Sequence, residues 1–397
     1  MPSPRDFITG PWRAVSVLGV TQILAWGALF YPPVLTVPLI AHDHGWSRTF
    51  AMLGFSLGLF VGGLASRYVG SMIDRLGGHV VMPCGSLIGA VGLAGLVVAP
   101  NAAAYFAVWT VLGVAMAASL YDPAFATLGR IFGAAARAPI TTLTLAGGFA
   151  STVSWPATQF LIDKAGWRGT YLVYAALLAA VAAPLHAFAL PRQHAAHPAT
   201  AATAVPEAPA AKPKLAPHGL VFVLVATAFA SYAFVPSALS AHMLAIFERF
   251  GLTPATVVAI GMLFGPAQVL ARICELTLAR NLPPLAIARF SIALLVAAFA
   301  LLAVTPFSAI VAAAFALMYG MANGLMTIAR GTVPLSLFGA SGYGRLVGRI
   351  GGPFLVVQAV APVVLAYVAE RGSDATGLAL VAAFAVVSMI CFAAIRS

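Results

Sequence analysis

Residues 70–79 read Gly-Ser-Met-Ile-Asp-Arg-Leu-Gly-Gly-His, a short charged stretch between two apolar runs at residues 49–69 and 80–99. A helix needs about 20 apolar residues to cross the ~30 Å hydrocarbon core of a bilayer. Each run is close to that length, so the sequence predicts two membrane-spanning helices joined by a tight polar turn. The glycines allow the chain to reverse direction and let the two helix ends approach closely.

The composition of the whole chain is that of a membrane protein. Of its 397 residues, 61% are hydrophobic and only 8% are charged, whereas soluble globular chains carry about 25% charged residues. The net charge of +11 does not indicate nucleic-acid binding, because the basic residues lie in short loops, where they act as topology signals. Cys84, Cys274 and Cys391 form no close ligand pair. We therefore expect an all-α, multi-pass membrane protein in the lipid bilayer, without metal or cofactor.

Twelve apolar runs of spanning length follow one another in two sets of six. The expected spans are residues 14–40, 49–69, 80–99, 102–132, 140–162, 169–189, 219–246, 253–278, 285–304, 307–330, 345–368 and 377–395. Between the sets, residues 191–217 are rich in Ala and Pro, a composition that cannot bury a core. We expect a six-helix bundle over residues 1–190, a cytoplasmic linker over 191–217 and a second six-helix bundle over 218–397.

The two sets of spans repeat small residues at a spacing of just over 200 positions. The matches are Gly58 and Gly62 with Gly261 and Gly265, Gly113 with Gly320, Gly147 and Gly148 with Gly351 and Gly352, Pro156 with Pro362, and Gly166 with Gly372. This near-constant offset predicts two pseudo-symmetric bundles.

The distribution of basic residues predicts the orientation. With the N-terminus inside, five basic residues lie outside and fourteen lie in the cytoplasm. The cytoplasmic residues are Arg5, Arg13, Arg75, Arg130, Arg137, Arg192, Lys212, Lys214, Arg280, Arg289, Arg330, Arg345, Arg349 and Arg396. This bias predicts that both termini are cytoplasmic.

The pattern Gly-x-x-x-Asp-Arg-x-Gly over residues 70–77 resembles the loop between helices 2 and 3 in the major facilitator superfamily of secondary transporters. The resemblance implies twelve helices in two bundles that rock around a central site, with one chain as the functional unit. It also implies that the loop aspartate latches the two halves in the outward-facing state. The implied latch residues are Gly70, Asp74, Arg75, Gly77, Arg130 and Arg345. An ordinary charged turn is the alternative.

Arg272 is a charge inside the predicted span 253–278. Such a charge costs a few kcal/mol or more and therefore usually faces a partner or an aqueous cavity. Glu275 lies one turn later and could pair with it, and snorkelling to the cytoplasm is a further alternative. As a substrate contact, a guanidinium can hold a carboxylate through two hydrogen bonds. An arginine here, with Gly-Trp-Ser-Arg at residues 45–48, resembles the monocarboxylate and oxalate/formate porter branch of the superfamily.

Other polar side chains in the spans are candidates for the transport site. Asp122, within the sequence Ser-Leu-Tyr-Asp-Pro at residues 119–123, is suited to bind and release a proton if it is buried. Pairing with Arg130 or Arg67 is the alternative. Glu275 is the second candidate for proton coupling. Side chains that could line a cavity are Trp26, Tyr31, Tyr121, Gln159, Gln268, Asn323 and Gln358; amides in hydrocarbon need partners.

These observations predict a secondary transporter that carries a small organic anion, a monocarboxylate, across the inner membrane. Arg272 would hold the anion, and a proton would travel through Asp122 or Glu275. An efflux carrier for hydrophobic or cationic compounds, with the two acids as cation sites, is the main alternative. A membrane-embedded enzyme or a transporter-like sensor is more remote, because the sequence has no catalytic dyad or nucleotide loop and the linker is short.

Overall fold

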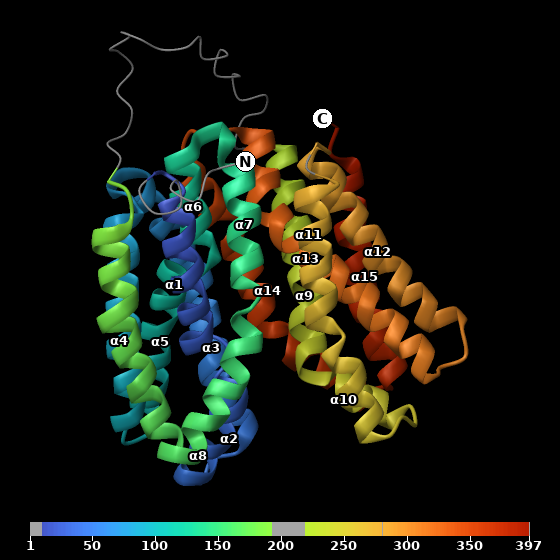
Figure 1. The fold of residues 1–397 in the computed structure, drawn as a ribbon. Coiled ribbons are helices and arrows are strands. Elements are labelled where there is room, and N and C mark those ends of the chain that lie inside the picture. The colour runs from blue at the N-terminus through green and yellow to red at the C-terminus, as the bar shows by residue number, and fades with distance from the viewer. Residues whose placement is uncertain (1–9, 193–218, 280, 397) are drawn as a thin grey trace.

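The computed structural model describes residues 10–192, 219–279 and 281–396. The regular secondary structure of these residues is entirely helical. The start of the first helix and the end of the last lie on the same side of the molecule (Figure 1), which we call the terminal face. Residues 193–217 of the predicted linker lie outside the described part of the chain, so its extent and role remain predictions.

The first half of the chain begins with two consecutive helices and a run of longer ones. These are α1 (Arg13–Leu29), α2 (Pro33–His44), α3 (Arg48–Leu76), α4 (Gly78–Val98), α5 (Ala102–Ser119), α6 (Tyr121–Phe132), α7 (Arg137–Gly147) and α8 (Ala150–Leu177). A short 3₁₀ turn, η1 (Gly133–Ala136), precedes α7, and two π-helical turns, η2 (Leu178–Ala182) and η3 (Leu185–Ala189), extend α8.

The second half contains α9 (Leu220–Arg249), α10 (Pro254–Met262), α11 (Phe264–Thr277), α12 (Pro284–Val304), α13 (Ala309–Phe338), α14 (Tyr343–Arg371) and α15 (Asp374–Ala394). Five helices of the two halves, α3, α5, α10, α13 and α15, begin at a polar side chain that accepts a hydrogen bond from a backbone N–H of the first turn. The capping residues are Ser47, Asn101, Thr253, Ser308 and Ser373. Such caps satisfy N–H groups that the helix itself leaves without a partner.

Ten apolar helical ranges are long enough to cross a membrane, and one of them, Ala102–Ala189, runs for 88 residues. That range is far too long for a single crossing. It reverses at Gly133 and at Gly166, whose φ angles are +56° and +66°, a region that favours glycine. Divided there, it gives three crossings. The described residues therefore hold twelve membrane-crossing segments in two bundles of six, which agrees with the fold predicted from the sequence.

An ion pair in each bundle shows the internal repeat. In the first bundle, Arg168 Nη1 lies 2.7 Å from Asp43 Oδ2. In the second, Arg249 Nε lies 2.6 Å from Asp374 Oδ2. Both pairs join residues 125 positions apart, and the two pairs lie just over 200 positions from each other. The repeat therefore preserves the contact while exchanging the acidic and basic partners.

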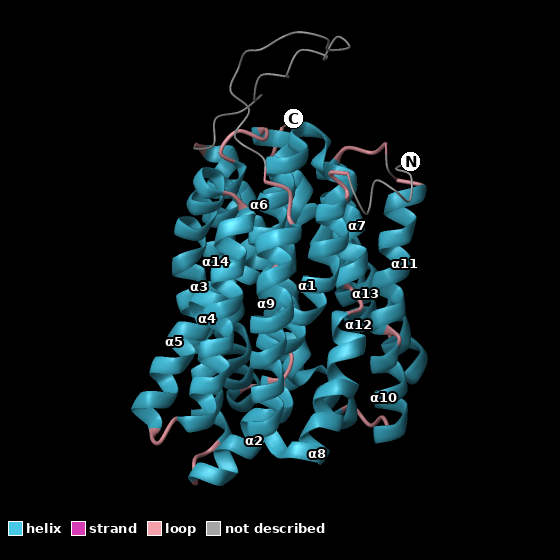
Figure 2. Ribbon diagram, turned by 60° about the vertical axis from the view of Figure 1, so that its left-hand side comes forward, coloured by secondary structure: helices cyan, strands magenta, loops and turns pink. Residues whose placement is uncertain are grey.

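The bundles meet most closely along α3 and α14, which lie side by side in Figure 2. Gly63 packs against Gly352, and a Cβ at Gly63 would lie 2.8 Å from the Gly352 carbonyl oxygen. Towards the terminal face, Gly70 packs in the same way against Gly344. Small residues let two helix backbones approach within a membrane. In Figure 1 the bundles converge at the terminal face, whereas α2 and α8 lie apart from α10 at the opposite face.

Candidate functional site

The fourth membrane crossing is broken at the level where the bundles face each other. Its first part, α5, ends at Ser119, and Leu120 leaves the helical region with ψ −157° before α6 begins. The break frees the Ser119 carbonyl, which accepts a hydrogen bond of 2.7 Å from Gln22 Nε2. Pro123 fits the first turn of α6, because that turn needs no internal N–H donors. The break thereby places Tyr121 and Asp122 between the bundles.

Asp122 forms an ion pair with Arg330, a residue of α13 in the other bundle. Arg330 Nη2 lies 2.5 Å from Asp122 Oδ2, and the two side chains are only 12% and 11% exposed. The Arg330 guanidinium also stacks on Phe354, with Cζ 3.7 Å from the ring centroid. Gly351 of α14 lies so close to Asp122 Oδ2 that any side chain there would collide with it. The second carboxylate oxygen, Asp122 Oδ1, is buried without a hydrogen-bond partner.

This pairing corrects two expectations from the sequence. Arg330 was expected in the cytoplasm, and Asp122 was expected to pair with Arg130 or Arg67 if it paired at all. The predicted span ended at Arg330, but α13 continues to Phe338. Those eight further residues add about 12 Å of helix at 1.5 Å per residue. Arg330 therefore lies inside the protein, where Asp122 compensates its charge.

A small cavity of about 20 Å³ lies beside the ion pair. Both bundles line it, with residues from α1, α5, α6, α13 and α14. The lining residues are Trp26, Phe30, Met116, Ala117, Leu120, Tyr121, Asp122, Pro123, Arg330, Leu355 and Gln358. Most of these are apolar, and the charged atoms come from one ion pair, an arrangement typical of small-molecule sites.

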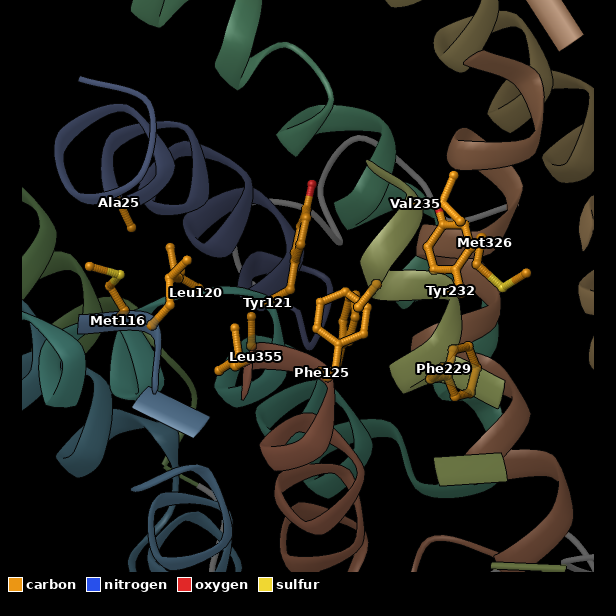
Figure 3. Close-up of a cluster of buried hydrophobic side chains, with 14 of the residues drawn as sticks. Ala25, Met116, Leu120, Tyr121, Phe125, Phe229, Tyr232, Val235, Met326 and Leu355 are labelled. Carbon is orange, nitrogen blue, oxygen red and sulfur yellow. The ribbon is translucent and has the colours of Figure 1, made fainter. Parts of the chain in front are cut away.

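Aromatic rings form one wall of this cavity. The ring centroid of Trp26 lies 5.1 Å from that of Tyr121 and 6.0 Å from that of Tyr31. Trp26 Nε1 donates a 3.1 Å hydrogen bond to Gln22 Oε1, which fixes the indole. Tyr121 stacks on Phe125 at 5.3 Å, and Figure 3 shows both rings near Leu355 of α14. Of the predicted cavity residues, Trp26, Tyr121 and Gln358 thus line the cavity, and Tyr31 contacts its aromatic wall.

Arg272 lies in α11 and reaches across to the first bundle. Its side chain is almost fully buried. Nη1 donates to the Thr144 carbonyl of α7 at 2.9 Å, and Nη2 donates to Gln268 Oε1 at 3.3 Å. Gly148, which follows α7, leaves the room that the guanidinium occupies. The predicted site residues Arg272 and Gln268 therefore contact each other, close to the end of α7.

The alternative in which Arg272 pairs with Glu275 is wrong. A helical side chain leans towards the N-terminus of its helix, and Arg272 accordingly extends towards Gln268. Glu275 Oε1 instead lies 2.9 Å from Arg137 Nη2 of α7, and the Glu275 side chain is 2% exposed. Arg137 also donates to the Leu282 carbonyl at 2.6 Å. Glu275 therefore belongs to a contact between the bundles at the terminal face.

The remaining predicted site residues occupy different places. Asn323 Oδ1 accepts a hydrogen bond from the Tyr232 hydroxyl, a residue that the sequence did not suggest. The Tyr232 and Tyr121 phenols both lie within electrostatic range of Arg272 and Arg330, which puts the two arginines around one region. Gln159 is exposed on α8, and its amide donates to Asp163 at 2.8 Å, so the structure does not bring it to the others.

The charged turn at residues 70–79 contacts the second bundle directly. Asp74 accepts hydrogen bonds from the backbone N–H groups of Gly344 and Arg345 at the start of α14, each 2.8 Å long. Arg130 donates to the carbonyls of Ile73 and Asp74. A helix N-terminus favours such an anion through its unpaired N–H groups and its dipole.

The other residues of this turn hold its shape or stay outside the contact. Arg345 Nε donates to Ser71 Oγ at 3.2 Å. Gly77 adopts φ +86° and separates α3 from α4 by a single residue. Arg75 is exposed on the last turn of α3. The turn thus joins α3, α6 and α14 at the terminal face.

Comparison with known proteins adds the family. The chain superposes on the human organic anion transporter MFSD10 (TETRAN) with a TM-score of 0.73, at 18% identity over 96% of this chain and 99% of that one. It superposes on a bacterial homologue of the iron transporter ferroportin, in an outward-facing state with soaked iron, with a TM-score of 0.73, at 12% identity over 96% and 98% of the chains. The transporter FucP in the outward conformation gives 0.69, at 12% identity over 98% and 99%.

At these identities the superpositions show the fold alone. No match was found among the curated proteins searched by sequence. The family model described as Major Facilitator Superfamily, in contrast, matches residues 16–351, most of the chain. It spans the charged turn at residues 70–79, the broken fourth crossing and both arginines of the central region. This match indicates a transporter and not an enzyme. The chain belongs to the Major Facilitator Superfamily.

Proposed function

We propose that this protein transports a small organic anion, a monocarboxylate, in company with a proton. The observation that carries the proposal is the charge of the central region. Arg272 is buried and Arg330 is only 12% exposed, both act on the same tyrosines, and Asp122 pairs with Arg330 alone. One positive charge is left over, and its burial is costly unless an anion compensates it.

The same observation argues against a carrier for cations. That alternative needs Asp122 or Glu275 to be available to a positively charged substrate. Asp122 binds Arg330, and Glu275 binds Arg137 at the terminal face. We therefore assign the proton site to Asp122, which lines the cavity, in preference to Glu275.

Arg272 is the proposed anion contact. Its guanidinium carries five N–H donors, and the contacts to Thr144, Gln268 and Gly324 leave donors for a carboxylate. The membrane orientation is also a proposal, in which the terminal face lies in the cytoplasm of an inner membrane. Moving Arg330 out of the cytoplasmic group leaves thirteen basic residues against five outside, so the bias persists. In this orientation the bundles meet on the cytoplasmic side, which corresponds to an outward-facing transporter.

The test is uptake of radiolabelled lactate and pyruvate into proteoliposomes that contain the purified protein. Arg272→Lys keeps the charge but loses the planar fork, so we expect uptake to fall about tenfold or more, which corresponds to ~1.4 kcal/mol. Arg67→Lys is the matched control, because Arg67 is exposed on α3 and stacks on Tyr68. Equal uptake by the wild type and Arg272→Lys would remove Arg272 from the site. Absence of carboxylate uptake by the wild type would refute the proposed substrate class.

A further inference from the structure

Arg330 is a cavity-lining arginine whose present partner belongs to the protein itself. We infer that Arg330 is a second anion-binding residue, and that the Asp122 carboxylate holds the place of a substrate carboxylate until Asp122 takes up a proton. The inference rests on the proposed function, since it assumes that the cavity binds a carboxylate. It adds a binding residue on α13 and the step that links the proton to the substrate.

The geometry of Arg330 is that of an anion site. Phe354 lies against one face of the guanidinium and fixes its plane, with Cζ 3.7 Å from the ring centroid. The cavity adjoins both Arg330 and Asp122. Stacking on an aromatic ring leaves the N–H groups at the guanidinium edge free to bind a planar carboxylate. The Asp122 carboxylate now occupies that edge.

The ion pair with Asp122 is a one-point contact. Arg330 Nη2 binds Oδ2, while Oδ1 of the same carboxylate is buried without a partner. A guanidinium and a carboxylate bind more strongly when two parallel N–H···O bonds form. A carboxylate that enters from the cavity is free to take the two-point arrangement, whereas Asp122 is held by its helix. Exchange of one carboxylate for the other therefore improves the contacts of Arg330.

The exchange balances in charge only if a proton is taken up. The Arg330–Asp122 ion pair breaks, a proton binds to the Asp122 carboxylate, and Arg330 binds the carboxylate of the substrate. Arg330 and Asp122 sum to zero charge before this step. Arg330, protonated Asp122 and the substrate carboxylate sum to zero after it. A carboxylate that arrived without the proton would leave Asp122 as a buried, uncompensated anion, which is strongly unfavourable.

The surroundings of Asp122 leave Arg330 as its principal charged partner. From α14, the Tyr343 phenol lies within electrostatic range of Asp122, and Tyr121 precedes Asp122 in α6. Arg272 of α11 and Arg330 both act electrostatically on Tyr121 and on Tyr232 of α9. Five ionisable groups of α6 and the helices around it contact groups other than Asp122, namely Asp74 and Arg67 on α3, Tyr105 on α5, Arg137 on α7 and Arg130 on α6 itself.

The test measures carboxylate binding to the purified full-length protein in lipid nanodiscs by isothermal titration calorimetry. Lactate, pyruvate, oxalate and succinate serve as probes over a range of pH. For the wild type we expect affinity to rise by up to about tenfold for each pH unit of acidification, as uptake of one linked proton requires. For Asp122→Asn, a neutral mimic of the protonated acid, we expect binding that no longer depends on pH. At neutral pH it should be at least tenfold tighter than that of the wild type.

Arg330→Gln should bind the same probe at least tenfold more weakly than the wild type at acidic pH, with partial recovery in Arg330→Lys. A gain of affinity in Asp122→Asn cannot result from misfolding, so that variant separates the exchange from a structural role. Wild-type binding that does not depend on pH overturns the inference, and so does binding by Asp122→Asn that still depends on pH. In either case carboxylate binding that still requires Arg272 leaves the proposed function standing. If no probe binds the wild type at any pH, both the inference and the proposed function fail.

Discussion

Substitution of Asp74 by Asn tests whether the charged turn at residues 70–79 holds the bundles together. The carboxylate accepts two hydrogen bonds of 2.8 Å from the first N–H groups of α14. Asn keeps the shape but presents one acceptor and one NH₂ group, so one of the two bonds is lost. A hydrogen bond to a charged group contributes about 1.5–3 kcal/mol, and the attraction of an anion to a helix N-terminus adds about 0.3–1 kcal/mol.

Partial exposure of Asp74 places the total near the lower end, at about 2 kcal/mol. This energy is present only while α3 and α14 touch. Its loss therefore raises the population with the terminal face open by about thirtyfold, since ~1.4 kcal/mol corresponds to a factor of ten. The family resemblance assigns the aspartate the same latching role, which remains a prediction for this chain.

The assay is a spin-label distance measurement between Ala135 and Leu278. Both positions are exposed, and they lie in different bundles near the start of α7 and the end of α11. Cysteines are introduced there after the native ones are replaced, namely Cys84, Cys274 and Cys391. Asp74→Asn should shift the distance distribution towards longer values, and Arg75→Gln, an exposed charge removed from the same turn, should not. An unchanged distribution for Asp74→Asn would refute the latch.

Two further outcomes follow from contacts between the bundles, and a third follows from a contact within the first bundle. Gly348→Val would force the backbones of α3 and α14 apart, because even a Cβ there meets α3 backbone atoms. We expect a loss of about 1–3 kcal/mol in thermal stability. Gly265→Val should change stability little, because the space around Gly265 is open. Arg137→Gln leaves the buried Glu275 unpaired and should destabilise the purified protein by about 3–5 kcal/mol. Adding Glu275→Gln should restore part of that stability. If the losses of the two single variants simply added in the double variant, the pairing would be contradicted. Gln22→Leu leaves the carbonyl at the α5–α6 break without its donor, which should cost about 1–3 kcal/mol in chemical denaturation; unchanged stability would contradict that role.

The sequence predicted the fold because the signals that specify it are local. Each crossing needs only a run of apolar residues, and the reversals at Gly133 and Gly166 need only a residue that tolerates positive φ. The contact of Asp74 with the start of α14 could also be anticipated, because the family motif places an acid at that turn. These features require no knowledge of which distant side chains meet.

The central ion pair was beyond the reach of the same reasoning. Hydropathy cannot decide whether Arg330 ends a span or lies inside one, because the eight residues after it are largely apolar. The answer depends on a partner 208 positions away, Asp122. The internal repeat was a usable signal, since the two residues occupy nearly matching places in the two halves. The partner of Glu275 was missed for the converse reason. Local spacing along the helix suggested Arg272, whereas the structure pairs Glu275 with Arg137 of the other bundle.

The placement of the charges argues for rocking of two rigid bundles. On the opposite face, the ion pairs Asp43–Arg168 and Arg249–Asp374 each join two helices of one bundle, so they persist when the bundles move. At the centre and at the terminal face, the charged contacts of Asp122, Glu275 and Asp74 all join one bundle to the other. Opening of the terminal face must break each of these contacts. In the proposed exchange, protonation of Asp122 and delivery of a carboxylate to Arg330 would replace one of these contacts by a bond to the substrate. The energy of opening would then fall only when the substrate and the proton are both bound.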